Sequence, residues 1–143
     1  MKWMFSLVTL TMLVSNVQAK EYQVLMKNKT STGLNMGFEP DFLKVNKGDT
    51  VKFIPVDKGH SAESFKGGLP KGVKDWKAGL NKEIVVKFDV EGVHMFKCLP
   101  HFAMGMIGAV QVGPASNLVD IKKVTIAPKI PKERWEKILA QIK

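Results

Sequence analysis

The segment CLPHFAMGM, residues 98–106, places a thiol, an imidazole and two thioethers within one short connection. Residues 93–98 before it and 108–112 after it are apolar runs bounded by glycine, a pattern typical of strands. Cys98 is the only cysteine of the chain. His101 follows a tight turn led by Pro100, so we expect its imidazole to lie beside the sulfur.

The chain has two further histidines, and strand geometry separates them. His94 and Cys98 share strand parity, but their Cα atoms are about 13 Å apart at the usual rise per residue, too far to bind one metal. We expect His94 to be a core histidine. His60 follows a predicted strand in the loop of residues 57–60 and can reach the same end of the barrel from the opposite sheet.

One cysteine, two histidines and a methionine make a poor structural zinc site, because zinc prefers several thiolates or a closed set of harder donors. A trigonal arrangement of two histidines and a cysteine, with a weak axial methionine, is instead the pattern of blue-copper electron-transfer sites. Spacing alone leaves Met104 and Met106 both open as the axial ligand.

The rest of the chain predicts a small antiparallel β-sandwich. Alternation predicts strands at residues 22–26 and 83–89, and turn formers at 46–49 between 42–45 and 50–54 predict a hairpin. Residues 59–81 lack a clear period, so we expect an irregular strand or short helix along the side of the barrel.

Two helices are predicted within residues 117–142. Asn117 is a candidate cap for a helix through about residue 124, and Pro131 is a favourable start for the second helix. An apolar stripe on the second helix predicts packing onto the strands rather than partner binding; it comprises Trp135, Ile138, Leu139 and Ile142.

Residues 1–19 have the pattern of a secretory signal peptide, with Lys2, an apolar run too short to span a bilayer, and a small-residue cleavage site ending at Ala19. Cleavage shortens the chain from 143 to 124 residues and, with loss of Lys2, its formal net charge from +9 to +8. We expect one domain, 20–143, in the periplasm, without stable membrane association. A lone thiol in an oxidising compartment is a liability unless something occupies it.

Several segments resemble the pseudoazurin family of cupredoxins: residues 38–45, 48–53, 57–60, 92–93, 97–98, 100–101 and 105–108. The similarity spans essentially all of residues 20–143. It implies an all-β, cupredoxin-like Greek-key β-sandwich or barrel with two C-terminal α-helices. It also implies one type 1 copper per chain, held by His60, Cys98, His101 and Met106.

Three residues depart from the family pattern. Ser61 stands where the family usually has an asparagine that braces the two ligand loops, Leu99 replaces a small polar residue, and His94 replaces a tyrosine. Ser61 is shorter than the asparagine, but the site is still expected to bind copper.

Copper held by four side chains has no open position for substrate, so we expect no enzymatic activity and a role in single-electron transfer. In cupredoxins the electron passes through the C-terminal histidine, here His101, whose neighbours in sequence are apolar: Pro100, Phe102, Met104 and Ile107. Candidate docking residues are Pro100 and Met104 with the lysines Lys29, Lys58, Lys77 and Lys97.

A basic surface steers an acidic partner into fast, salt-sensitive encounters. The resemblance implies a denitrification reductase, typically copper nitrite reductase, as that partner, and we expect the chain to be a monomer. Nucleic acid is excluded because no recognition motif is present. One alternative is a periplasmic copper-delivery protein, which would be colourless. The other is a copper oxidase or reductase, for which only His94 remains to build a second copper site.

Overall fold

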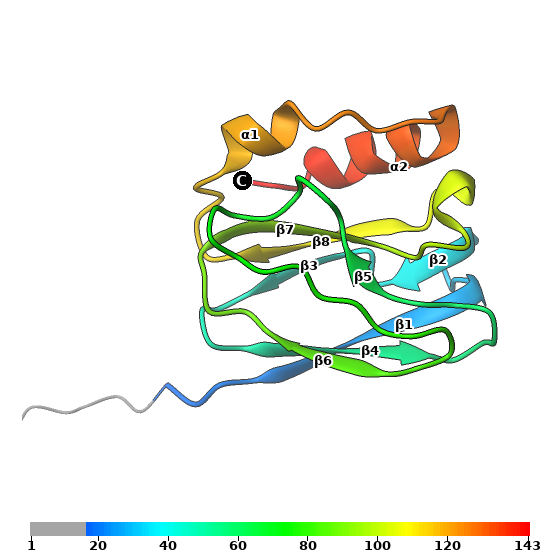
Figure 1. Cartoon of the computed structure of the whole chain (residues 1–143), viewed down its shortest axis with the longest axis horizontal. Helices are drawn as coiled ribbons and strands as arrows, with labels where there is room; N and C mark the ends of the chain where they lie inside the picture. Colours follow the sequence, from blue (N-terminus) through cyan, green and yellow to red (C-terminus); the bar gives the residue numbers. More distant parts are fainter. Residues whose placement is uncertain (1–16) are drawn as a thin grey trace, which may run out of the picture.

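The computed structural model describes residues 17–143, and its strands form two four-stranded sheets. The elements in order are β1 (Glu21–Lys29), β2 (Asn35–Glu39), β3 (Phe42–Val45), β4 (Thr50–Pro55), β5 (Glu63–Ser64), β6 (Ile84–Lys87), β7 (Gly92–Lys97), the 3₁₀ helix η1 (Phe102–Met104), β8 (Ile107–Val112), α1 (Leu118–Lys122) and α2 (Lys129–Leu139). One sheet has the order β2-β1-β4-β6 and the other β3-β8-β7-β5. The predicted sandwich with two C-terminal helices is confirmed (Figure 1).

The molecule has three layers, with the helices over one face of the β3-β8-β7-β5 sheet and the second sheet against its other face (Figure 1). The core between the sheets is rich in aromatic rings: Phe38, Phe53 and Phe96 meet there, and the rings of Phe38 and Phe96 pack edge to face at 4.8 Å. Edge-to-face packing stabilises such cores beyond the area that is buried.

The predicted hairpin of residues 42–45 and 50–54 is wrong. β3 pairs in parallel with β8, whereas β4 pairs with β1 and β6 in the other sheet. The turn formers therefore carry the chain from one sheet to the other, and the carboxylate of Asp49 accepts the backbone N–H groups of Asn46 and Lys20 at 2.8 Å each. The sheets are also mixed rather than antiparallel, because β1 and β4 run parallel as well.

The other predicted strands are present. Residues 84–87 form β6, and Ile84, Val86 and Phe88 face inward while Val85 is exposed. The stretch 59–81 contributes only the two-residue β5 and one bridge between Glu63 and Lys77, as an irregular strand along the barrel's side.

The C-terminal helices pack on the outer face of the β3-β8-β7-β5 sheet. Trp135 and Ile138 are buried against Met95 and Ile107, so the predicted packing of the apolar stripe is confirmed. Helix α2 begins at Lys129, two residues before the predicted start.

Asn117 does not cap α1 with its side chain, contrary to the prediction. Its amide instead accepts from the backbone N–H of Val93 at 2.7 Å and donates to the carbonyl of Val93 at 2.9 Å. Asn117 therefore joins the start of α1 to β7. Among residues 17–143, no helix is both long and apolar enough to cross a bilayer.

Candidate metal centre

Three donor atoms from two separate parts of the chain converge at one end of the sandwich. The Sγ atom of Cys98 lies 3.8 Å from Nδ1 of His60 and 3.7 Å from Nδ1 of His101, and the two Nδ1 atoms are 3.2 Å apart. A point equidistant from the three atoms lies about 2.1 Å from each, close to the bond lengths of a divalent transition metal to nitrogen and sulfur. Within residues 17–143, His60, Cys98 and His101 are the histidine, cysteine and acidic side chains whose ligand atoms lie close enough together to hold one metal ion.

Backbone hydrogen bonds close the loop that carries two of these donors. Cys98 follows β7 directly, and its N–H donates to the carbonyl of Met106 at 3.0 Å. The carbonyl of His101 accepts from Met104 at 3.0 Å and from Met106 at 3.2 Å. Gly105, with φ of 93°, lets the chain turn back into β8 after η1. The loop is therefore tied at both ends, which brings His101 back beside Cys98.

His60 is fully buried between β4 and β5, and an asparagine orients its ring. Nε2 of His60 lies 2.9 Å from Oδ1 of Asn28 near the end of β1. Since Nδ1 faces the other donors, Nε2 carries the proton and donates to Asn28, which leaves Nδ1 free to bind a metal. Asn28 itself is held by its backbone N–H, which donates to the carboxylate of Asp57 at 2.7 Å.

Asn28 is not among the residues predicted from the sequence. Its role depends on the parallel pairing of β1 with β4, in which Met26 lies opposite Pro55. No local pattern around Asn28 signals that pairing, so only the assembled sheet reveals the contact.

The two candidate methionines differ in burial. Met106 is fully buried in the same core cluster as Cys98, whereas Met104 is 44% exposed at the surface. Met106 therefore faces the interior beside the donors, and Met104 belongs to the outer surface of η1.

Burial shifts the pKa values of two of the donors. It raises the pKa of the Cys98 thiol, while the neighbouring polar groups of Ser61 and the backbone of His101 oppose that rise. Burial also lowers the pKa of His60, and nearby His101 adds to the effect. A neutral His60 has Nδ1 free to bind a metal, and the Cys98 thiol keeps its proton until a metal replaces it.

The donor set suits copper. A soft thiolate and a thioether favour Cu(I), imidazoles bind Cu(II), and two histidines with one cysteine make the trigonal blue-copper arrangement. His60, Cys98 and Met106 are fully buried, which limits the access of water to this position.

His94 lies apart from this cluster, as predicted. It is 3% exposed, its Nε2 lies 2.8 Å from the carbonyl of Val90, and the ring of Phe88 packs edge to face against it at 5.1 Å. Burial lowers its pKa. His94 is a hydrogen-bonded core residue.

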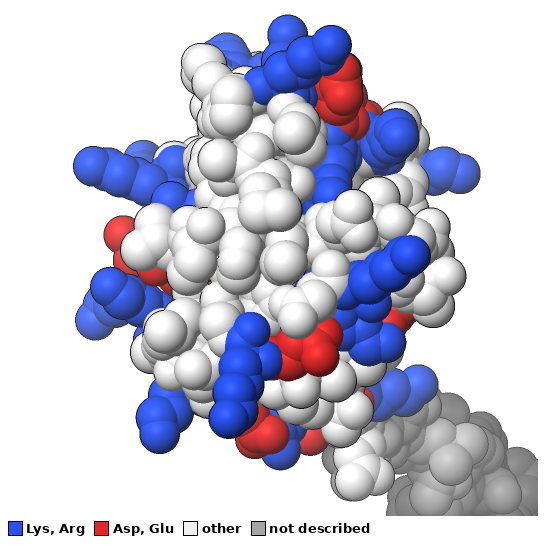
Figure 2. All heavy atoms as spheres, turned by 90° about the vertical axis from the view of Figure 1, so that its right-hand side faces the viewer, with Lys and Arg blue, Asp and Glu red and all other residues white. Residues whose placement is uncertain are grey.

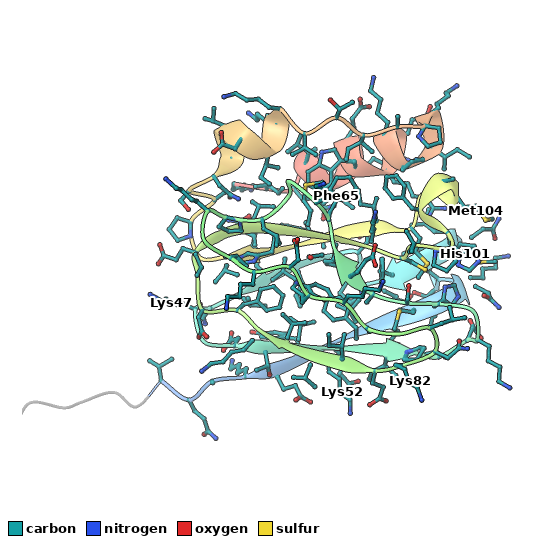
Figure 3. The ribbon with its side chains drawn as sticks, viewed as in Figure 1. Lys47, Lys52, Phe65, Lys82, His101 and Met104 are labelled. Carbon is teal, nitrogen blue, oxygen red and sulfur yellow. The ribbon has the colours of Figure 1, made fainter. Side chains whose placement is uncertain are left out.

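His101 and Met104 lie at the end of the molecule opposite Lys47 (Figure 3). Viewed from that end, the middle of the face is mostly uncharged, and the charged side chains around it are mainly lysine and arginine with some acidic groups among them (Figure 2). Leu99, Pro100 and Met104 are exposed there, and His101 and Phe102 are half-buried. Ile107, another apolar neighbour of His101 in sequence, is only 2% exposed and belongs to the core rather than to this face.

The predicted docking lysines are not equivalent. Lys29, Lys58 and Lys77 are exposed. Lys97 is half-buried, and its ammonium group lies 3.6 Å from the Glu63 carboxylate.

Comparison with known proteins agrees with this geometry. The family described as copper binding proteins of the plastocyanin/azurin family matches residues 24–113. The fold and the site thus define a copper-binding protein of the blue-copper, electron-transfer class, which is not a class of enzymes.

The most informative relatives belong to one branch of that class. A putative pseudoazurin of Rhizobium leguminosarum bv. viciae is 44% identical over 90% of this chain and 84% of its own length. A pseudoazurin of Paracoccus pantotrophus is 40% identical over 87% and 85%. The crystal structure of pseudoazurin from Hyphomicrobium denitrificans superposes with a TM-score of 0.82 at 43% identity, covering 86% of this chain and 98% of that one. The chain belongs to the pseudoazurin family, and its cofactor is copper.

Proposed function

We propose that His60, Cys98, His101 and Met106 hold one copper ion and that the chain carries single electrons between redox proteins. The triangle of Cys98 Sγ and the two histidine Nδ1 atoms carries this proposal, because its dimensions fit a metal at its centre. Met106 is the proposed axial ligand, since it is buried beside Cys98 and Met104 is not.

The bound copper supplies one-electron chemistry by alternating between Cu(I) and Cu(II). The chain contributes a fixed set of donors. Asn28 orients His60, the backbone of the loop fixes Cys98 and Met106, and the core keeps water out. Donors that do not move between the two oxidation states keep the reorganisation on electron transfer small.

His101 is the proposed exit for the electron, because its ring is the half-buried member of the donor triangle and lies at the uncharged face. Pro100 and Met104 would contact the partner around this ring. An apolar centre with a charged rim permits close docking without trapping a charge.

The proposed partner is an acidic redox protein, such as copper nitrite reductase in denitrification. The exposed lysines Lys29, Lys58 and Lys77, with the partly compensated Lys97, would supply the positive charge that speeds encounter with an acidic surface and leaves the complex short-lived. The chain would act as a monomer, because a stable dimer through this face would cover His101.

We propose a periplasmic location after cleavage behind Ala19. Residues 1–16 of the signal peptide lie outside the described residues. The backbone nitrogen of Lys20 lies 2.8 Å from Oδ1 of Asp49, a carboxylate that is 3% exposed. Cleavage would turn this nitrogen into an ammonium group beside that carboxylate, so the new terminus would be held at the start of β1.

A visible spectrum of the purified protein after addition of Cu(II) tests the proposed site. An intense visible band from the thiolate–Cu(II) bond should appear in the wild type and be absent from Cys98→Ser. Stopped-flow mixing with a candidate reductase then tests the partner: the rate should fall steeply as ionic strength rises. A colourless copper complex that passes its metal to other proteins would instead support the copper-delivery alternative.

A further inference from the structure

Arg134 on helix α2 donates to backbone carbonyls at the edge of the copper loop. Its Nη1 lies 2.8 Å from the carbonyl oxygen of Met36 and 3.0 Å from that of Gly105, and its Nη2 bonds the carbonyl oxygen of Asn35 at 2.6 Å. One side chain thus joins the C-terminal helix, β2 and the loop between η1 and β8.

The contact with the loop is close. A Cβ atom added to Gly105 would fall 2.6 Å from both Cδ and Nε of Arg134. Gly105 also has φ of 93°, a conformation that glycine adopts at little cost. The loop therefore lies directly against the arginine side chain. Glycine at position 105 both adopts the positive φ and leaves room for Arg134.

The helix that carries Arg134 is itself fixed. The next residue, Trp135, is 4% exposed, and Ile138 is fully buried against the outer face of the sheet. The guanidinium group consequently extends from an anchored position toward the loop.

Arg134 uses its donors on carbonyls rather than on a carboxylate. Among the described residues, no acidic group lies within ion-pair distance of it. Burial lowers the pKa of Arg134, and the charge of half-buried Asp41 opposes this lowering. A planar group with several fixed donors is well suited to hold separate carbonyls in one arrangement.

We infer that Arg134 is a positioning residue for the copper site, an inference that rests on the proposed ligand set. Gly105 precedes Met106, and Met106 is bonded through its backbone to both His101 and Cys98. Holding the Gly105 carbonyl to β2 and α2 fixes the distance of the Met106 thioether from the other donors. That axial distance tunes the redox potential of blue-copper sites.

The C-terminal helices thereby acquire a role at the metal centre. Without Arg134, the loop would keep its own backbone bonds but lose the hydrogen bond that joins Gly105 to α2 and, through the same side chain, to β2. We expect Met106 then to sample a range of positions, which alters the potential and weakens metal binding.

The experiment compares Arg134→Gln, Arg134→Lys and the control Lys137→Gln, which removes an exposed positive charge from the same helix. For Arg134→Gln we expect copper affinity to fall by about tenfold or more, as for other residues that orient metal ligands. The redox potential and the ratio of the visible bands should shift, and in the copper-free protein amide exchange at Gly105 and Met106 should speed up. Arg134→Lys should be intermediate, and Lys137→Gln should match the wild type.

An Arg134→Gln protein with wild-type affinity, potential, visible bands and amide exchange would overturn the inference. So would a variant that is only less stable, with exchange raised evenly over the whole chain. If Arg134→Gln does not fold, Arg134→Lys decides by the same measurements. Failure of the wild type to form a blue copper complex would instead overturn the proposed ligand set.

Discussion

The ammonium group of Lys97 lies 3.6 Å from the carboxylate of Glu63, and this ion pair joins the strand that leads to Cys98 to the strand that follows His60. The same ammonium group lies 5.4 Å from the ring centres of both Phe65 and Phe102. Lys97 is thus held by three contacts, and part of its charge is compensated before any partner arrives.

Removing the acidic member of this pair should favour an acidic partner. In Glu63→Gln the charge of Lys97 is uncompensated, so we expect association at low ionic strength to be about twofold faster. Stopped-flow kinetics with an acidic redox partner measures this rate. Lys58→Gln, which removes an exposed lysine, should slow association. An equal slowing by Glu63→Gln would show that the pair supports docking as a unit.

Asn28→Ala should weaken copper binding. Without Oδ1 of Asn28, the Nε2 proton of His60 loses its acceptor, and the buried ring no longer has one preferred orientation. We expect the affinity to fall by about 10- to 100-fold. Competition with a copper chelator measures it. Asn46→Ala, a matched change in the turn between β3 and β4, should leave the affinity unchanged; an equal loss in both variants would contradict a specific role for Asn28.

Ser61→Ala should lower the redox potential. Ser61 opposes the rise in the pKa of the Cys98 thiol. A hydroxyl that donates to a ligand sulfur reduces the electron density the sulfur gives to the metal and so favours Cu(I). Loss of one hydrogen bond of about 1 kcal/mol corresponds to about 40 mV for a one-electron couple. Cyclic voltammetry provides the measurement. A potential that stays the same or rises would show that the hydroxyl does not act on the sulfur.

His94 should make the copper-free protein less stable in mild acid. Its folded-state pKa is lowered by burial, so as pH falls below its ordinary value of about 6.5 the unfolded chain takes up a proton that the folded protein does not. The stabilisation is present above that pH and is lost below it, by up to about 1.4 kcal/mol per pH unit.

Urea unfolding of the wild type and His94→Gln between pH 8 and pH 5 isolates this contribution. His60 and His101 are present in both proteins, so their effects cancel in the difference. We expect the wild type to lose more stability than His94→Gln as pH falls. Parallel curves would mean that His94 is protonated equally in the folded and unfolded states.

Asp49→Asn should cost more stability in a protein that begins at Lys20 than in one that retains Gln18 and Ala19. In the first, the carboxylate faces an ammonium group, and in the second it faces an uncharged amide N–H. The difference should be about 1–2 kcal/mol, the excess of a charged over a neutral hydrogen bond. Urea unfolding of the four proteins measures it, and equal costs would show that the terminus does not pair with Asp49. Mass spectrometry of the exported protein checks that Lys20 is its first residue.

Local sequence was enough to find Cys98, His101 and most strands. Alternating apolar residues determine a strand wherever one face is buried, and a cysteine and a histidine three residues apart across a turn meet without help from the rest of the chain. The apolar stripe of α2 likewise predicted its packing, because a helix with one apolar face must cover something.

The pairing of strands that are distant in the chain could not be predicted from the sequence. The turn formers at 46–49 are equally compatible with a hairpin and with a crossing between sheets, and the choice depends on β1 and β8 as partners. Asn117 has the side chain of a helix cap, yet its amide pairs with Val93, because β7 lies within reach only in the folded molecule.

The two residues proposed to orient the copper ligands, Asn28 and Arg134, were also beyond prediction from local sequence. Asn28 and Arg134 are 32 and 29 positions from His60 and Gly105, the residues they hold. What the sequence alone determined was that Cys98 and His101 lie together, because that depends on side-chain chemistry and a short spacing, whereas the preference for Met106 over Met104 came from burial in the folded protein. Only the tertiary structure decided how those donors are oriented, because hydrogen bonds between distant segments exist only once the sheets and the C-terminal helix have packed.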